Sequence, residues 1–406
     1  MDEVVVIGVG MHRFGEHPHL RLPDLARVAV WAAIEDAGID ARAIDIAYVA
    51  NCYAGVITGQ SDAVAPAVLG YTGLSGLPMI HVSGGTSAAT AAFHEAVMAV
   101  GSGQYRIGLA LGVEKQFVPG NPARSISAIN TSLEKVVAMD LGMTPLAELA
   151  MGLRRLMDGR GWTRADFARV TAKNRWHASM NPLAEVQQPI SEAEVLAAPE
   201  VAWPLTRPMC ASAGVDGAAA ALVCTRRTAR ELGATAGPRV AAMHLRSTPY
   251  LRNDAPVRRT GVPSMDDVAE VFATVYSRAG VGPHDLELLQ IHDAVAPEEL
   301  LAYEVMGLCA PGEEAALLAS GATRLGGRIP TGTDGGLLAR GHPVGVTGLA
   351  QIHETVVQMR GRAGPRQAWH DGRPPRIAAV QNAGARGGAA NGVPVCAGLI
   401  FQMDRP

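Results

Sequence analysis

The sequence predicts an α/β protein built from two similar halves, with a further segment inserted into the first half. Two observations lead to this prediction. A strand–helix–strand order near the amino terminus recurs about 240 residues later, and a helix–strand unit then recurs in the same order. Chance rarely supplies two such matches in one order, so we expect a duplicated structural unit. The 406 residues, 48% of them hydrophobic, are enough for two or three packed units.

The first repeated unit begins with a short buried strand at residues 4–9, which is rich in β-branched residues. Residues 23–37 carry apolar residues at helical spacing, and this predicted helix ends at Gly38. A second strand is predicted at residues 46–50. The corresponding elements of the second half are a strand at 239–245, a helix at 265–279 that ends at Gly280 and a strand at 286–291.

The second repeated unit is a helix of small residues followed by a strand. It is predicted at 85–100 with 107–111, and again at 345–359 with 376–381. Residues 116–203 interrupt the repeat with prolines and two helical runs, so we interpret them as an inserted loop domain.

The domain prediction therefore has three parts. They are an amino-terminal half at 1–115 and 204–235, the loop domain at 116–203, and a carboxyl-terminal half at 236–406 whose last strand holds a buried Cys396.

Composition excludes several classes of protein. The net charge of −3 gives no basic surface for nucleic acid. The five cysteines are scattered without a CxxC pair, which argues against a disulfide scaffold or a metal site and for a reducing compartment. No signal peptide and no apolar run of the ~18 residues needed to span a bilayer are present. We expect a cytoplasmic protein with no membrane contact.

Five motifs carry a resemblance to a known family. They are GVEK at 112–115, VDGAAA at 215–220, IHDA at 291–294, EELL at 298–301, and GGLLARGHP at 335–343 with Gly345 and Gly348. The pattern resembles the thiolase superfamily almost end to end, and it is most similar to the sterol-carrier-protein-type thiolases. The resemblance implies a five-layer αβαβα thiolase fold, a coenzyme A (CoA) thioester as substrate, no tightly bound cofactor, and a homodimer at least.

The family places its nucleophilic cysteine at the start of a buried helix, and the matching position here is Thr86. A helix amino terminus lowers a thiol pKa and can hold an oxyanion, but a threonine hydroxyl stays un-ionised at neutral pH. Thr86 is therefore either a nucleophile activated by a neighbouring base or a helix-capping residue without chemistry. Ser87 is the second candidate nucleophile, and it is also expected in the loop that holds an oxyanion.

Two histidines are implied as catalytic residues. His342 matches the histidine that lies beside the nucleophile in thiolases, which makes it the candidate base. His292 matches the histidine that helps to hold the thioester oxygen, and a neutral imidazole can donate the hydrogen bond that an enolate needs. The alternative for His292 is an ordinary histidine with a satisfied hydrogen bond.

The last glycine-rich turn departs from the family. Asn382 stands where relatives carry a cysteine or histidine that moves a proton at the α-carbon, and an amide cannot do so. Gly388, later in the same turn, is implied as a residue that holds an oxyanion. The stretch Gly332–Asp334 also differs from the usual asparagine-containing turn of the family.

These departures favour retro-aldol cleavage of a β-hydroxyacyl-CoA, because that reaction needs a base and an enolate site but no acyl-enzyme. Thiolase-fold aldolases that shorten steroid side chains also lack the cysteine, and they use a small zinc-ribbon/OB-fold partner that holds the CoA end. They place tyrosines near these sites, whereas this chain keeps histidines. The alternatives are a thiolase or acyltransferase acting on a β-ketoacyl-CoA, and a non-catalytic subunit that binds acyl-CoA.

Overall fold

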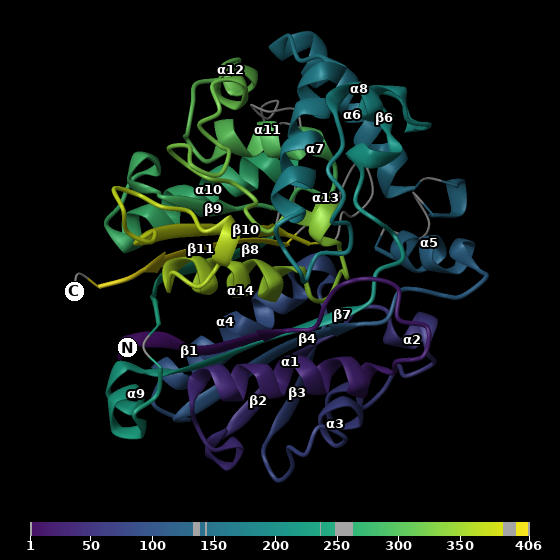
Figure 1. The fold of residues 1–406 in the computed structure, drawn as a ribbon. Helices are drawn as coiled ribbons and strands as arrows, with labels where there is room; N and C mark the ends of the chain where they lie inside the picture. The colour runs from purple at the N-terminus through teal and green to yellow at the C-terminus, as the bar shows by residue number, and fades with distance from the viewer. Residues whose placement is uncertain are drawn as a thin grey trace, which may run out of the picture.

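The computed structural model of the chain describes residues 2–132, 139–142, 144–235, 237–247, 263–384 and 395–404. In this part of the chain, nine strands are hydrogen-bonded in one continuous order that forms two sheet layers, with helices between and outside them (Figure 1). Among the described residues, no helix combines the length and apolar character that crossing a bilayer demands.

The amino-terminal sheet has the strand order β3-β2-β4-β7-β1. Its strands are β1 (Val4–Met11), β2 (Ile46–Ala50), β3 (Met79–Val82), β4 (Ile107–Glu114) and β7 (Gly217–Thr225). Strands β2, β3 and β4 run parallel, so their carboxyl ends meet at one edge of the sheet. Helix α1 (Leu22–Ala37) packs on the outer face, where Gly8 and Gly10 of β1 let its backbone approach closely. It ends at Gly38 in the left-handed conformation that glycine favours.

The carboxyl-terminal sheet has the order β8-β11-β10-β9. Its strands are β8 (Arg239–Ser247), β9 (Leu288–Gln290), β10 (Ile377–Ala383) and β11 (Val395–Gln402). Helix α10 (Pro263–Ala279) covers the outer face of this sheet, together with α11 (Ala296–Val305). One residue pair, Val5 with Arg239, links the two sheets along their edges.

Two helices fill the space between the sheets (Figure 1). They are α4 (Ala88–Gly101), which follows the single turn Gly85–Ser87, and α14 (Thr347–Met359). Alternate residues of the strands confirm the layering. Val4 and Val6 of β1 share a core with α4 and α14, whereas Val5 and Ile7 share one with α1. The predicted five-layer αβαβα thiolase fold is therefore confirmed.

The two central helices approach closely at one point. An ideal Cβ built on Gly348 of α14 would lie 2.1 Å from Thr90 Oγ1 and 2.9 Å from Thr90 N of α4. Only glycine fits there, because real Cβ atoms do not come within 3.0 Å of such neighbours. This contact brings the amino termini of the two helices to the same end of the molecule.

The segment between β4 and β7 is mostly helical and packs on the carboxyl-terminal half. Lys173 forms a buried ion pair with Glu299, and Asn174 Nδ2 donates to Asp293 Oδ2 at 2.8 Å. His177 Nε2 accepts from Leu325 N at 3.0 Å, so its Nδ1 donates to Gly332 O. Its helices are α5 (Pro122–Asn130), α6 (Pro145–Arg160), α7 (Arg164–Ala178) and α8 (Glu192–Ala197).

The remaining elements are short. They are α2 (Ala54–Ile57), α3 (Val64–Leu69), α9 (Arg226–Leu232), α12 (Glu314–Ala319), α13 (Gly336–Arg340), β5 (Glu200–Ala202), β6 (Leu205–Thr206), and single turns at Ala41–Ala43, Met139–Leu141, Arg207–Met209, Pro283–Asp285 and Gly364–Arg366.

Most predicted elements match the structure within two residues, and the larger differences have local causes. The sequence predicts a strand at 213–224, but β7 begins only at Gly217, because the Asp216 carboxylate accepts from Gln116 N and Phe117 N. The helix expected at 85–100 starts with the separate turn Gly85–Ser87, in which Gly85 has a φ of 59°. Both differences lie at the end of the sheets where the cavity described below opens.

Candidate active site

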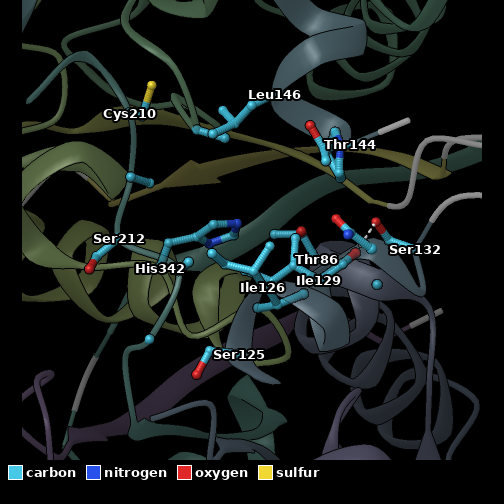
Figure 2. Close-up of a pocket in the computed structure, with 18 of the residues that line it drawn as sticks. Thr86, Ser125, Ile126, Ile129, Ser132, Thr144, Leu146, Cys210, Ser212 and His342 are labelled. Carbon is cyan, nitrogen blue, oxygen red and sulfur yellow. Dashed lines mark hydrogen bonds between the residues drawn. The ribbon is translucent and has the colours of Figure 1, made fainter. Parts of the chain in front are cut away.

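A cavity of about 690 Å³ lies at the end of the two sheets, a size in the range of small-molecule sites. Its wall includes Thr86, His292 and His342, which come from three separate turns. Figure 2 labels two of them, Thr86 and His342. Much of the rest is apolar and comes from the inserted segment, namely Ile126 and Ile129 of α5 and Leu146 and Leu149 of α6. The three turns that the sequence singled out therefore do meet in one cavity.

Thr86 lies in the turn between β3 and α4, and its side chain is buried in the cavity wall. The turn is held from two sides. Ser87 Oγ donates to Gly84 O at 2.9 Å, and the Cys52 thiol donates to Gly85 O at 3.0 Å. Burial raises the pKa of Cys52, which suits a structural thiol. Ser87 does not line the cavity, so of the two candidate hydroxyls only Thr86 faces it.

His342 is positioned by Thr347 at the start of α14. Its Nδ1 lies 2.7 Å from Thr347 Oγ1, and that hydroxyl lies 3.2 Å from Pro343 O. A carbonyl oxygen only accepts, so both bonds form together only when Thr347 donates to Pro343 and Nδ1 donates to Thr347. Nε2 then carries the lone pair. Burial, aided by the charge of Arg340, lowers the pKa of His342 to about 3, so the ring is neutral at pH 7.

His292 follows strand β9 and stands beside His342. The two ring centroids are 5.5 Å apart, with 84° between the ring planes. The backbone N–H of His292 donates to Gln381 Oε1 at 2.8 Å, which fixes the turn after β9 against the end of β10. Two imidazoles, one after a strand and one before a helix, therefore lie beside each other in the cavity wall.

The carboxyl end of β4 holds the turn that carries His342. Glu114 accepts hydrogen bonds from Gly345 N at 3.0 Å and from Cys52 N at 3.0 Å, and Gln116 Oε1 accepts from Val344 N at 2.5 Å. Burial raises the pKa of Glu114 to about 7. The GVEK motif of the first half thus fixes the histidine turn of the second half.

Two further predicted positions fall elsewhere. Asn382 is buried, but it does not line the cavity, and its Nδ2 donates to Gln351 Oε1 of α14 at 2.9 Å. The reason is the alternation along β10, which turns Asn382 away from the side of Gln381. Gly388 lies outside the described residues.

Sequence reasoning missed the role of several wall residues. In the sequence Glu298 stands out only as part of the EELL motif, and Gln381 gives no signal of its own. The i, i+3 spacing of Ile126 with Ile129 and of Leu146 with Leu149 does indicate one apolar face on each helix. Cys210 also lines the wall, and burial raises its pKa to about 12, so its thiol is a poor nucleophile at neutral pH. Across the described ranges, no cluster of three or more His, Cys, Asp or Glu side chains could hold a metal ion.

Family models match both halves of the chain. The model described as "Thiolase, N-terminal domain" matches residues 4–190, and "Thiolase C-terminal domain-like" matches residues 259–395. The chain belongs to the thiolase family. Its cavity accordingly stands at the junction of the two thiolase halves.

Curated thiolase relatives cover nearly the whole chain. The benzoylsuccinyl-CoA thiolase subunit BbsB of Thauera aromatica is 36% identical over 88% of this chain and 89% of its own length. An acetyl-CoA acetyltransferase of Methanothermobacter thermautotrophicus is 33% identical over 96% and 98%. Sterol carrier protein 2 of Rattus norvegicus is 32% identical over 96% of this chain and 71% of its length, which confirms the predicted resemblance.

Solved structures agree with this family assignment. The "Ltp2-ChsH2(DUF35) aldolase" superimposes with a TM-score of 0.79 at 25% identity, over 99% of this chain and 98% of that one. Human mitochondrial 3-ketoacyl-CoA thiolase gives a TM-score of 0.71 at 14% identity, over 100% and 99%, which supports the fold alone. The proteins similar to this chain thus include one named as an acetyltransferase and one named as an aldolase.

Proposed function

We propose that the chain breaks a carbon–carbon bond of an acyl-CoA thioester by retro-aldol cleavage of a β-hydroxyacyl-CoA. The observation that carries the proposal is the neutral His342, with its Nε2 lone pair available, beside His292 in a cavity where Thr86 stands in place of a thiol. A steroid or aromatic side chain would suit the apolar wall formed by α5 and α6.

The proposed reaction proceeds through an enolate. Nε2 of His342 takes the proton of the β-hydroxyl group, and the Cα–Cβ bond breaks as the β-carbon becomes a carbonyl. The electron pair of that bond forms an enolate, whose charge rests on the thioester oxygen near His292. This negative charge favours the imidazolium form of His342, which returns its proton to Cα. The products are an aldehyde or ketone and a shortened acyl-CoA.

This mechanism includes no covalent step at Thr86. Its hydroxyl is un-ionised at neutral pH, and a threonine becomes a nucleophile only when an adjacent base takes its proton. In the proposal Thr86 shapes the turn before α4, and the first backbone N–H groups of a helix are a general site for an oxyanion. Retro-aldol cleavage forms no acyl-enzyme and so needs no nucleophile at this position.

A thiolase or acyltransferase acting on a β-ketoacyl-CoA is the second candidate. It is favoured by the 36% identity with a benzoylsuccinyl-CoA thiolase subunit and by the acetyl-CoA acetyltransferase relative. Thiolysis consumes free CoA, whereas retro-aldol cleavage does not. The two candidates therefore differ in their requirement for CoA as well as in the oxidation state of the β-carbon. Absence of turnover on both substrate classes would leave the non-catalytic acyl-CoA-binding subunit.

We also propose a partner and a homodimer. The aldolase structure carries two names, Ltp2 and ChsH2(DUF35), and the BbsB relative is named as a subunit, which supports a partner subunit. The family resemblance implies that this partner is a small zinc-ribbon/OB-fold protein that holds the CoA end. Strand β3 is the outer strand of its sheet and exposes Ile80, which supports pairing with a second copy there. Co-purification from the native host and light scattering after gel filtration test both proposals.

The function itself is tested with a panel of β-hydroxyacyl-CoA and β-ketoacyl-CoA thioesters of different acyl groups. The protein is assayed with its co-purified partner, and products are identified by mass spectrometry. A carbonyl fragment with a shortened acyl-CoA from the β-hydroxy substrates supports the lyase, and cleavage restricted to the β-keto substrates contradicts it.

A further inference from the structure

Gln381 places a side-chain amide in the cavity wall with its orientation fixed. The residue is 1% exposed and lines the cavity at the end of β10. Its Oε1 accepts from His292 N at 2.8 Å. A backbone N–H can only donate, so the atom that faces it must be the amide oxygen, and the other atom must be the NH₂ group.

That NH₂ group has no hydrogen-bond acceptor in the part of the chain that the structure describes, although its nitrogen is almost fully buried. Buried amide donors are normally paired, because an unpaired one loses its bonds to water without replacement. The amide of Gln351 shows the normal case. Gln351 Nε2 donates to both Ile291 O and Gln381 O.

Gln381 thus lines the cavity with an unpaired amide donor, on a side chain already bonded to the backbone of His292. An acyl-CoA substrate brings carbonyl oxygens into this cavity, and such oxygens are the acceptors that a neutral amide donor suits. Charge develops on the thioester oxygen when the enolate forms, which strengthens a preplaced hydrogen bond to it.

We propose that Gln381 Nε2 donates a hydrogen bond to the thioester oxygen of the substrate and is, with His292, one of two donors to that oxygen. This inference rests on the proposed function for the identity of the ligand. The ligand class is an acyl-CoA thioester, and the group recognised is its carbonyl oxygen. One side chain then has two tasks, since Oε1 places the His292 turn and Nε2 contacts the substrate.

Two variants separate these tasks. In Gln381→Glu the carboxylate can still accept from His292 N, but its second oxygen no longer donates when ionised. In Gln381→Met both hydrogen bonds are lost at similar side-chain length and without a new charge. Circular dichroism and thermal unfolding establish that each variant is folded, and either variant alone suffices for the test.

Binding is measured by calorimetry with an acyl-CoA thioester and with the matching CoA thioether, which lacks the carbonyl oxygen. Because two donors contact the oxygen, we expect wild type to bind the thioester more tightly than the thioether. Both variants should lose about 3- to 10-fold of this preference, the contribution of one hydrogen bond, at unchanged thioether affinity. On a turned-over substrate, kcat should fall by about 10²- to 10³-fold, as for the loss of one oxyanion donor, with a small change in KM.

The outcomes are distinguishable from those of the proposed function. If the variants lose their share of the thioester preference but wild type cleaves no β-hydroxyacyl-CoA, the lyase is contradicted and the Gln381 contact stands. A wild type with no preference overturns the contact, whatever the turnover. The contact is also overturned if Gln381→Glu, measured above pH 7, keeps the thioester preference and the kcat of wild type. The side chain would then act only as the acceptor for His292.

Discussion

His292 and His342 meet edge to face, with ring centroids 5.5 Å apart. His292 follows strand β9 and His342 precedes helix α14, so the pair forms only where two structural elements of the carboxyl-terminal half converge. Thr347 fixes the tautomer of His342, and Gln381 fixes the backbone of His292. The pair thus presents a neutral base and a potential hydrogen-bond donor to the same cavity.

Replacing His342 by glutamine should remove the base. We expect kcat/KM to fall by about 10²- to 10⁴-fold, the range that general-base catalysis contributes. Thr347→Val is the matched variant, because it keeps the base and removes only the hydroxyl that holds Nδ1. Steady-state kinetics should show a smaller loss for Thr347→Val, and equal losses in the two variants would contradict the assignment.

The pH dependence should reflect the low pKa of His342. Because burial lowers this pKa from 6.5 to about 3, the ring stays unprotonated as pH falls, and the base is retained in mild acid. We expect kcat/KM to show no acid limb from His342 between about pH 5 and 8. A tenfold loss per pH unit below 6.5, with circular dichroism unchanged, would mean that the ring titrates like an exposed histidine.

Thr86 should carry no acyl group during turnover. We expect the intact mass of the protein to stay unchanged after incubation with acyl-CoA, and Thr86→Ala to lower kcat by less than about tenfold. Ser87→Ala is the neighbouring control, since Ser87 does not line the cavity. A stable adduct on a peptide that contains residues 86–87, absent from Thr86→Ala, would favour the acyltransferase instead.

The contact between the two central helices should be intolerant of any side chain at Gly348. A methyl group there would overlap Thr90, so Gly348→Ala should destabilise the fold by about 1–3 kcal/mol in urea unfolding. Thr90→Ala should restore part of this loss, because it removes the nearest atom, Oγ1. Gly152→Ala in α6 meets no atom within 4 Å and should be neutral or stabilising. Equal stability of Gly348→Ala and wild type would refute the close packing.

The sequence predicted the layers of the fold well, because each depends on local patterns. β-branched runs specify the strands, and Gly38 and Gly280 end their helices in left-handed conformations. The sequence also predicted that Thr86, His292 and His342 belong to one site, because motifs identify the turn that carries each residue and the duplication places these turns at corresponding ends of the two halves. Periodicity could not predict the packing of the inserted segment on the second half, because that packing depends on the ion pair of Lys173 with Glu299, 126 residues apart.

The polar contacts of the site were beyond sequence reasoning for a related reason. Asn382 was predicted at the site from its place in a motif, but strand alternation turns it toward Gln351. Gln381, one residue earlier, lines the cavity instead. A shift of one position along β10 decides which amide reaches the substrate, and only coordinates fix that register.

The most direct test of the account is a single-turnover reaction of a β-hydroxyacyl-CoA with the purified protein and its partner, with no free CoA present. We predict equal amounts of a carbonyl fragment and a shortened acyl-CoA, and neither product with His342→Gln. Cleavage that occurs only when free CoA is added, or only with a β-ketoacyl-CoA, would contradict the account.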